Sequence, residues 1–489
     1  MQVAIDSDDS APLIVWLRQD LRLTDNPALI AAADTGRPVV PLYILDQTPG
    51  VRAPGGASLW WLDKSLAALA ASLEAIGSRL ILRKGVAETV LTDLIVETEA
   101  GGVLWNRLYD PAAIDRDTAI KVRLKDDGVA CESFNAGLLN EPWTVKNGSG
   151  LPYKVFTPYW RAARDQRGPV HVEPPPETLA APRAWPTSDA LADWKLQPTT
   201  PDWSKGFDLW KPGEAGARER LDDFLSGPID GYDRQRDIPG IEATSRLSPH
   251  LHFGEIGPRQ VWVAARNAVE AGDAPAIEVE KFLSEVGWRE FNYAILFHNP
   301  ALPRANFRPE FDGFPWARDP AAFDVWSRGE TGYPIVDAGM RELWTTGFMH
   351  NRVRMIVASF LIKHLLIDWR EGEAWFWDTL VDADLASNVG NWQWVAGSGA
   401  DASPYFRIFN PIAQGQKFDP AGTYVRRWVP ELGSLPDALI HEPWKASGQL
   451  SAAAARIYRK PIVGHAAARE RALEAYRGLK GDDVSRGSE

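Results

Sequence analysis

Polar and aromatic residues with helical spacing gather in the second half of the sequence, where they could bind and polarise an organic molecule. In SEVGWREFN, the positions i, i+3, i+4 and i+7 are Glu285, Trp288, Arg289 and Asn292. A helix places such positions on one face, so a carboxylate, an indole, a guanidinium and an amide would point the same way. Taken alone, this face is more typical of a solvated ion pair beside a core tryptophan than of a site.

Two further stretches add amides, acids and indoles. In HNRVRM, Asn351, Arg354 and Met355 share a helical face. The stretch DADLASNVGNWQWVAG carries Asp382, Asp384, Asn388, Trp392 and Trp394. Two acids so close together would repel each other if both were buried without cations or hydrogen-bond donors. We therefore expect them to have partners, Arg354 and a hydrogen-bonding ligand among them, and the three stretches to line one cavity.

The string TSRLSPHL is typical of a helix start that binds phosphate. Its polar side chains are Thr244, Ser245, Arg246 and Ser248. Hydroxyl groups and backbone N–H groups at a helix N-terminus favour an anion, because the first N–H groups of a helix have no partner within it. A capped helix start without any ligand has the same sequence. Together with the acids and indoles further on, the string predicts the phosphate end of a cofactor.

An α/β domain is predicted to precede these residues. Over residues 12–140, short apolar runs alternate with amphipathic stretches, and the runs predict strands at 13–17, 39–45, 79–85, 102–107 and 129–134. Strands that alternate with helices specify a mostly parallel, doubly wound sheet with helices on both faces. No G-x-G-x-x-G turn follows the first strand, which argues against an NAD-dependent dehydrogenase.

The rest of the chain changes character twice. Residues 141–217 lose periodicity and contain Pro-rich segments such as VEPPPETLAAPRAWPTSD, which predicts a long linker. From 218 to 480, long amphipathic runs dominate and strand-like alternation is nearly absent. We expect this region to be an all-helical domain that carries the three chemically interesting stretches.

Composition restricts the classes of function. The formal net charge of -12 argues against a protein that coats nucleic acid through its overall field, although it leaves room for a local basic groove. The single cysteine, Cys131, excludes an intramolecular disulfide and a cysteine-based zinc site, and we expect no metal. The sequence predicts a cytoplasmic monomer with no membrane partner, since it shows neither a secretory signal nor a membrane-spanning apolar run. The chain has 22 tryptophans but only 11 tyrosines, an unusual excess of tryptophan that a role in the structure or the function must explain.

Several long strings, in order along nearly the whole chain, resemble the photolyase and cryptochrome family. They are IVWLRQDLRLTDNPAL, TSRLSPHL, WREFNY, GYPIVDAGMRELWTTGFMHNRVRMIVASFLIKHLLIDWREGE and NWQWVAGSGADASPYFRIFNP. The resemblance implies an N-terminal α/β domain for a light-harvesting antenna, a long linker, and a C-terminal helical domain that holds FAD in a folded, U-shaped form. Such an FAD site agrees with the missing glycine-rich turn.

The resemblance also implies which residues surround the FAD. On the phosphate side they are Tyr232, Thr244, Ser245, Arg246, Leu247 and Ser248. Around the isoalloxazine, ribose and pyrophosphate they are Arg289, Asn351, Arg354, Asp382, Asp384 and Asn388. Of these, Asn388 corresponds to the residue that faces the flavin N5.

DNA containing cyclobutane pyrimidine dimers is the substrate that the resemblance implies. Family members that repair this lesion surround it, flipped out of the duplex, with residues that match Glu285, Trp288, Asn351, Met355 and Trp394. Members that repair (6-4) photoproducts carry His at the positions of Asn351 and Met355, and plant-type cryptochromes commonly lack the Trp and Glu. We expect excited, reduced FAD to donate an electron that splits the dimer and then returns. Glu285 would stabilise negative charge on a dimer carbonyl.

The resemblance gives part of the tryptophan excess a use. It implies that Trp392, Trp369 and Trp316 form a chain that passes electrons from the surface to the flavin during photoreduction. Most of the other tryptophans are expected to fill the core and to cover the linker.

The antenna region departs from the family pattern. Folate-binding bacterial members carry an Asn-Glu pair shortly after the fourth strand, where this chain has Ala112 and Ala113. The segment AGSGADASPYFRIFNP is closer to the bacterial class III branch related to plant cryptochromes. We therefore expect 5,10-methenyltetrahydrofolate in a different pose, with a deazaflavin as the alternative.

Two other functions stay open at this point. A cryptochrome would respond to blue light by changing conformation or binding a partner, and the short segment after Tyr476 argues against it. A flavoprotein reductase would consume NAD(P)H in the dark.

Overall fold

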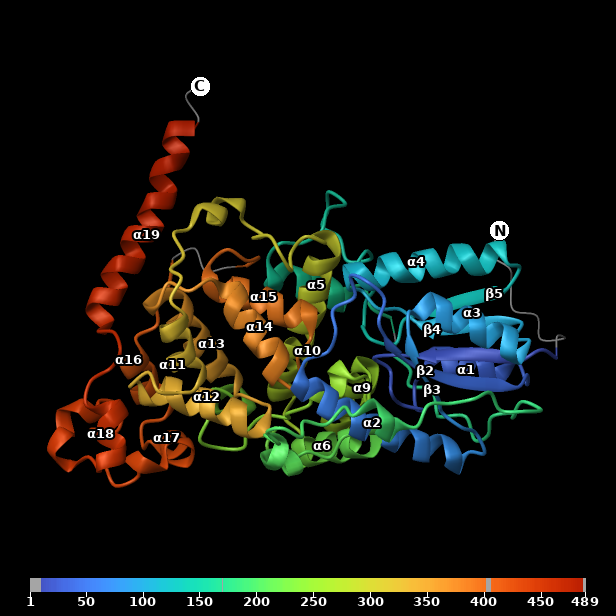
Figure 1. Cartoon of the computed structure of the whole chain (residues 1–489), viewed down its shortest axis with the longest axis horizontal. Coiled ribbons are helices and arrows are strands. Elements are labelled where there is room, and N and C mark those ends of the chain that lie inside the picture. The colour runs from blue at the N-terminus through green and yellow to red at the C-terminus, as the bar shows by residue number, and fades with distance from the viewer. Residues whose placement is uncertain (1–9, 169, 402–405, 487–489) are drawn as a thin grey trace.

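Two lobes lie side by side in the computed structural model, which describes residues 10–168, 170–401 and 406–486 (Figure 1). The N-terminal lobe, drawn in blue and cyan, is built around a sheet, and the C-terminal lobe, drawn from green to red, is helical. Within the described ranges, none of the helices combines the length and the apolar character that crossing a bilayer requires.

One parallel sheet of five strands forms the N-terminal lobe, with the order β3-β2-β1-β4-β5. The strands are β1 (Leu13–Leu17), β2 (Val39–Asp46), β3 (Ile81–Gly85), β4 (Gly102–Asn106) and β5 (Ala130–Phe134). Strand β1 pairs with β2 and β4, so Leu13 lies opposite both Val39 and Gly102. This arrangement confirms the doubly wound sheet.

Helices cover both faces of the sheet. They are α1 (Pro27–Asp34), α2 (Gly56–Ala75), α3 (Ala87–Thr98) and α4 (Pro111–Asp126). Helices α1 and α2 pack with Leu13 and Val15 on one face, while α3 and α4 pack with Ile14 and Trp16 on the other. Because both faces are covered, all of LIVWL is buried and the strand is a continuous apolar run.

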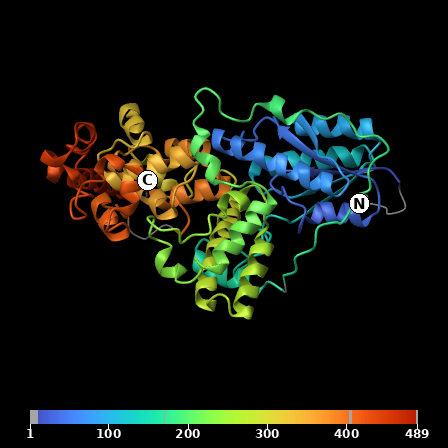
Figure 2. The same cartoon turned by 90° about the horizontal axis from the view of Figure 1, so that it is seen from below.

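The Pro-rich segment after the sheet is fastened to the outside of the sheet domain. The segment includes η1 (Leu191–Trp194) and η2 (Ser204–Leu209), whereas α5 (Phe156–Asp165), which precedes it, packs into the core of the helical lobe. The N–H groups of Asp25 and Val39 donate to the carbonyls of Glu173 and Ala180, at 2.9 and 2.8 Å. Figure 2 shows this teal and green trace running around the sheet domain. Backbone carbonyls of this segment thus find hydrogen-bond donors in the sheet domain around which it runs.

The C-terminal lobe is helical, as expected. Its elements are α6 (Glu214–Ser226), α7 (Tyr232–Gln235), α8 (Ser248–His252), α9 (Pro258–Ala271), α10 (Ala276–His298), η3 (Pro309–Gly313), α11 (Pro320–Ser327), α12 (Pro334–Thr346), α13 (Asn351–Ser359), η4 (Phe360–His364), α14 (Trp369–Thr379), α15 (Leu385–Ala396), α16 (Pro411–Phe418), α17 (Thr423–Trp428), η5 (Pro430–Leu432), η6 (Pro443–Gln449), α18 (Ala452–Tyr458) and α19 (His465–Arg486). The long, largely buried α10 lies at its centre and packs against α5, α9 and α15.

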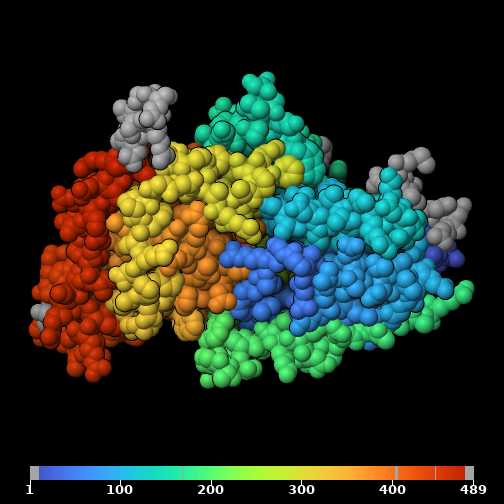
Figure 3. Space-filling model, turned by 45° about the horizontal axis from the view of Figure 1, so that its top comes forward, coloured from blue at the N-terminus to red at the C-terminus, as the bar shows by residue number. Residues whose placement is uncertain are grey.

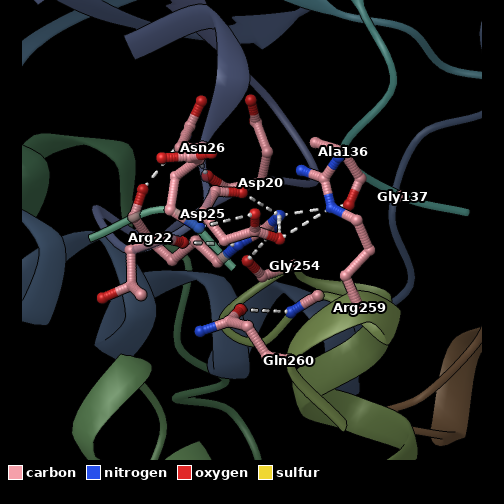
Figure 4. A network of polar contacts seen from close by, with 12 residues as sticks. Asp20, Arg22, Asp25, Asn26, Ala136, Gly137, Gly254, Arg259 and Gln260 are labelled. Carbon is pink, nitrogen blue, oxygen red and sulfur yellow. Dashed lines mark hydrogen bonds and ion pairs between the residues drawn. The ribbon is translucent and has the colours of Figure 1, made fainter. Parts of the chain in front are cut away.

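A buried arginine joins the two lobes (Figure 4). The guanidinium of Arg22 is 1% exposed and donates to carbonyl oxygens at 2.7 to 3.1 Å, those of Thr24, Asp25, Ala136 and Gly254. Arg259 of α9 adds an ion pair of 2.9 Å to Asp25. Gly254 has a φ of +65°, and a Cβ there would collide with the backbone at Gln19. The lobes therefore meet backbone to backbone, and Figure 3 shows the blue and yellow surfaces in continuous contact.

Candidate functional site

A cavity of about 520 Å³ opens in the helical lobe between α7, α8, α10, α13 and α15. All of the residues predicted to hold the cofactor line it: Tyr232, Thr244, Ser245, Arg246, Leu247, Ser248, Arg289, Asn351, Arg354, Asp382, Asp384 and Asn388. The residues predicted to surround the substrate line it too: Glu285, Trp288, Asn351, Met355 and Trp394. Its volume suits a large organic ligand.

Helix α10 presents a charged and an aromatic side chain to this cavity. The carboxylate of Glu285 accepts a hydrogen bond from Arg236 and lies 3.7 Å from the ammonium of Lys281. Although burial lowers the pKa of Arg236, the hydrogen bond and charge of Glu285 outweigh it and raise that pKa. The indole of Trp288 stacks on Phe156, with ring centroids 3.9 Å apart and planes 11° apart. The carboxylate of Glu285 is thus held by cations, and the indole of Trp288 is held nearly parallel to the ring of Phe156.

One turn further along α10, Arg289 ties the cavity to the sheet lobe. Its guanidinium donates to the carbonyl of Gly137 at 2.6 Å and lies 4.9 Å from the ring of Tyr293. These contacts hold the side chain across the back of the cavity, where a guanidinium would face the negative parts of a bound cofactor.

Helix α13 is oriented by a neutral histidine at its start. The Nδ1 of His350 accepts a hydrogen bond from the N–H of Arg352 at 3.2 Å, which caps the helix. Burial lowers the pKa of His350 to about 4, so the ring is neutral and can accept. This cap fixes the helix that carries Asn351 and Met355 into the cavity.

The two acids that were expected to need partners have them. Asp382 accepts from Arg354 at 2.9 Å, as predicted, and from the hydroxyl of Ser248 at 2.6 Å. Its second oxygen, Oδ1, is buried without a partner in the described chain. Asp384 caps α15 through the N–H of Ser387 at 2.8 Å and accepts from the hydroxyl of Tyr293. An orphaned carboxylate oxygen of this kind fits a ligand that donates a hydrogen bond.

Asn388 is aimed by two residues that the sequence analysis missed. Its amide nitrogen donates to Glu373 Oε1 at 2.8 Å and to the Glu373 carbonyl at 3.1 Å. Glu373 in turn accepts two hydrogen bonds from Arg52 of the sheet lobe, at 2.7 and 3.0 Å. Since the nitrogen is engaged, the amide oxygen is the atom left for the cavity. Arg52 lies so far from Asn388 in the sequence that no local pattern could reveal the link.

The three tryptophans predicted to carry electrons differ in burial and in their relation to the cavity. Trp392 lines the cavity and packs against Gly372 of α14, where a Cβ would collide with its ring. Trp369 starts the same helix, is fully buried, and donates to the side chain of Asn306 at 3.0 Å. Trp316 is partly buried and precedes Ala317, which forms a β-bridge near the start of α14.

The rim of the cavity is basic, although the chain as a whole is acidic. Arg236, Lys281, Arg246 and Arg352 all line it. Each pairs with a nearby acid, for example Arg352 with Asp237 at 2.6 Å. The sequence analysis missed Arg236, Lys281 and Arg352, because arginines and lysines dispersed over separate helices form no motif. A basic rim is what the approach of a phosphate backbone requires.

A second, much smaller space lies where the carboxyl ends of β1 and β4 meet the helical lobe. Its lining includes Asp20, Asn106, Arg107, Arg289 and Tyr293. Its volume of about 20 Å³ is room for about one water molecule. This position is the switch point of the sheet, where α/β domains bind ligands. In this conformation it does not accommodate a chromophore.

The donors and acceptors of the large cavity fit FAD. Phosphate can be met by the hydroxyl and N–H groups of 244–248 and by Arg246, and the polar edges of a flavin by Arg289, Asp382 and Asn388. The buried Oδ1 of Asp382, which has no partner among the described residues, could accept a hydrogen bond from such a ligand.

Comparisons with known proteins agree with this geometry. Residues 13–180 match the family model described as DNA photolyase, and residues 282–478 match the FAD binding domain of DNA photolyase. A deoxyribodipyrimidine photo-lyase of Agrobacterium fabrum is 55% identical over 476 residues, which covers 96% of this chain and 98% of that protein. Cryptochrome-1 of Arabidopsis thaliana is 40% identical over 482 residues, which covers 94% of this chain and 70% of that protein.

A solved structure shares the whole architecture. The crystal structure of a bacterial class III photolyase from Agrobacterium tumefaciens superimposes with a TM-score of 0.93 and 54% sequence identity. The match covers 98% of this chain and 100% of that one. Both lobes and the linker therefore share one arrangement with that protein.

Proposed function

The chain belongs to the photolyase and cryptochrome family as an enzyme of the deoxyribodipyrimidine photolyase type, and we propose that it reverses cyclobutane pyrimidine dimers in DNA with light. The observation that carries the dimer assignment is the convergence of five side chains on the FAD cavity. They are Glu285, Trp288, Asn351, Met355 and Trp394. A lesion bound against them would lie beside the flavin, close enough for electron transfer.

The aromatic and apolar side chains receive the lesion after it leaves the duplex. A dimer stacks and pairs poorly, so extruding it costs less than flipping a normal base. Trp288, Met355 and Trp394 offer the flipped-out lesion new apolar contacts. Because Trp288 is already stacked on Phe156, its ring is preorganised for this contact and loses little freedom when the lesion binds.

Glu285 acts together with its cations. Electron uptake places negative charge on a carbonyl of the dimer, and a preorganised polar group at that point lowers the barrier to splitting. The carboxylate of Glu285 holds Arg236 and Lys281 at the edge of the cavity. We propose that this cluster, with the acid as its anchor, stabilises the negative charge. Asn351 supplies an amide on the opposite wall.

Bound FAD, once reduced and excited, would supply the electron for ring opening and would take it back afterwards. The protein's part is to bind and orient it. Arg354 and Asp382 form an ion pair at the cavity wall, Arg289 spans its back, and the amide oxygen of Asn388 is directed inward by Glu373. This amide oxygen would accept a hydrogen bond from an N–H at the polar edge of a bound, reduced flavin. The chain Trp392, Trp369 and Trp316 would deliver electrons for photoreduction.

The antenna is 5,10-methenyltetrahydrofolate in this proposal, with a deazaflavin as the alternative. Ala112 and Ala113 cannot provide the polar contacts of an Asn-Glu pair. The space at the switch point is also small, which disfavours a chromophore buried there. The absorption spectrum of the protein as purified distinguishes the two, because a folate absorbs in the near ultraviolet and a deazaflavin further into the blue.

The basic rim gives the DNA a binding surface. Arg236, Lys281 and Arg352 stand at the mouth of the cavity, where they would meet the phosphates that flank a flipped-out dimer. We propose that this local charge overcomes the acidic balance of the chain.

Lesion choice provides the direct test of the proposal. Reduced protein with bound FAD is illuminated without oxygen, in parallel, with an oligonucleotide that carries a cyclobutane thymine dimer and with one that carries a (6-4) photoproduct. Normal thymines should reappear only from the first. Repair of neither lesion by FAD-loaded protein, or repair of the (6-4) photoproduct, would contradict the proposal.

A signalling function is the second candidate, favoured by the 40% identity to Cryptochrome-1 of Arabidopsis thaliana. Under that function, light would change the binding of a partner while dimers stayed intact. The experiment above separates the two functions, and consumption of NAD(P)H in the dark would instead indicate a reductase.

A further inference from the structure

One titratable side chain in the wall of the large cavity has no role in the proposed reaction. His252 ends α8, lines the cavity and is 8% exposed. Its Nδ1 is enclosed without a hydrogen-bond partner, and its Nε2, which is not enclosed, makes no hydrogen bond within the described residues. Buried polar groups in folded proteins are normally paired, so an imidazole without any partner indicates one that arrives with a ligand.

His250 provides the contrast on the same helix. It is 2% exposed, and its Nδ1 lies 2.5 Å from the carboxylate of Glu255. That carboxylate also accepts from the indole of Trp61 at 2.9 Å and from the N–H of Gly213 at 2.7 Å. Among the described residues, the Nδ1 of His250 is therefore engaged by a carboxylate, whereas the enclosed Nδ1 of His252 has no partner.

The groups around His252 place it with the cofactor-binding residues. It lies four positions after Ser248, on the same helical face, and Ser248 contacts Asp382. Asp384 and Asp382 face the ring from the start of α15, Arg289 from α10, and Glu255 from the turn after α8. Burial lowers the pKa of His252 more than the two aspartates raise it, so the ring is neutral at pH 7.

The tautomer follows from which nitrogen is enclosed. A neutral imidazole carries one N–H and one acceptor nitrogen. Enclosed donors without partners are rarer in proteins than enclosed acceptors. The proton of His252 therefore resides on Nε2, and this N–H is available to the cavity.

We propose that His252 is a further cofactor-contacting residue, whose Nε2–H donates a hydrogen bond to an oxygen acceptor of the bound FAD. The inference rests on the FAD site of the proposed function. It adds a contact on the α8 side of the cavity, next to the loop that would hold the phosphates.

Three variants of the full-length protein test the contact. His252→Gln places an amide N–H near the position of Nε2, and His252→Leu fills similar space without a donor. His364→Leu is the matched control, because His364 is a buried imidazole of the same lobe that lies outside the cavity and hydrogen-bonds His465 at 2.9 Å. The affinity for FAD is measured by titrating each apoprotein with FAD, and thermal unfolding of each apoprotein shows whether it is folded.

We expect His252→Leu to bind FAD about ten-fold more weakly, which corresponds to about 1.4 kcal/mol. His252→Gln should recover most of the affinity, and His364→Leu should bind FAD like the wild type. Equal affinity of His252→Leu and the wild type would overturn the inference, as would equal losses in the Gln and Leu variants or in the control. A wild-type protein that binds no FAD would overturn the proposed function itself, so the two failures can be told apart.

Discussion

Asn388 illustrates how a side chain in the cavity is aimed by residues outside it. Its amide nitrogen is held by Glu373, and Glu373 is held by Arg52 from the other lobe. Glu285 is also held by partners, but these, Arg236 and Lys281, themselves line the cavity. The cavity residues follow from sequence motifs, but their orientation depends on partners that no motif contains.

The Glu285 cluster leads to a first prediction. Glu285→Ala should lower the yield of repair per absorbed photon by about ten-fold, the effect of losing a hydrogen-bonded charged group. DNA affinity should fall much less. The measurements are repair yield under single-turnover illumination and binding of a dimer-containing oligonucleotide in the dark.

Glu280→Ala is the control for that prediction, because Glu280 lies on the same helix and pairs with Arg164 and Arg266 at the surface. It should leave both quantities unchanged. Equal losses of yield and affinity in Glu285→Ala would contradict a role in stabilising charge.

Trp369 gives a second prediction at the residue scale. Its indole is fully buried and donates to Asn306, and we propose that it relays electrons between Trp316 and the cavity-lining Trp392. Trp369→Phe should slow photoreduction of oxidised FAD by at least about ten-fold, whereas protein reduced chemically beforehand should repair dimers at the wild-type yield. Loss of repair by the pre-reduced variant would show that Trp369 serves the site in another way.

At the scale of elements, α13 depends on a histidine that must stay neutral. His350 caps this helix by accepting a hydrogen bond, and burial lowers its pKa from about 6.5 to about 4. Protonation is therefore harder in the folded protein than in the unfolded chain. The stability that His350 contributes is complete above about pH 6.5 and is lost as the pH falls towards about 4.

His350→Asn tests this dependence, since Asn caps a helix without titrating in that range. Between pH 7 and pH 4, the free energy of unfolding of the wild type should fall by up to about 3 kcal/mol more than that of the variant. The measurement is urea unfolding across this pH range. Parallel curves for the two proteins would refute the role of His350.

Much of the element structure could be predicted from the sequence, because hydrophobic patterning dominates it. All five strands lie where the apolar runs indicated, and the helical lobe followed from its amphipathic runs. Helix α4 was not recognised, since PAAIDRDTAIKVRLKD is largely polar and buries only a narrow stripe. The domain limits at 140 and 217 stay predictions, and α6 begins at Glu214.

For the candidate site, the sequence predicted most of the cavity residues but not the partners that orient them. The cavity residues were named because motifs mark them, and the pairing of Asp382 with Arg354 followed from the need to neutralise a buried acid. Arg52, Glu373 and His252 were missed. Their contacts join segments that are distant in sequence, and only the folded chain brings them together.

For the whole molecule, the contact between the lobes sets the geometry of the site. Arg22 is enclosed at this contact and donates four hydrogen bonds to backbone carbonyls, one of them across the contact at Gly254 (Figure 4). Arg52 and Arg289 add contacts that run from the cavity to the sheet lobe. A cofactor site that depends on both lobes requires the lobes to keep their positions relative to each other.

Arg22→Met should therefore destabilise the protein by about 3–5 kcal/mol, because it leaves buried acceptors and the carboxylate of Asp25 without this donor. The free energy of unfolding in urea measures the effect. Arg123→Met is the control, since Arg123 pairs with Asp127 at the surface and should contribute about 0–1 kcal/mol. Similar losses in the two variants would contradict the importance of the buried contact.

Light should return dimers to pyrimidines while the enzyme undergoes no net oxidation. The most direct measurement follows thymine recovery and the flavin spectrum together, in one anaerobic sample of fully reduced, FAD-loaded protein with excess dimer-containing oligonucleotide. We predict that many thymine pairs are restored per protein under illumination, that none are restored in the dark, and that the flavin stays reduced throughout. Oxidation of one flavin for each dimer split, or no recovery under light by FAD-loaded protein, would contradict the account.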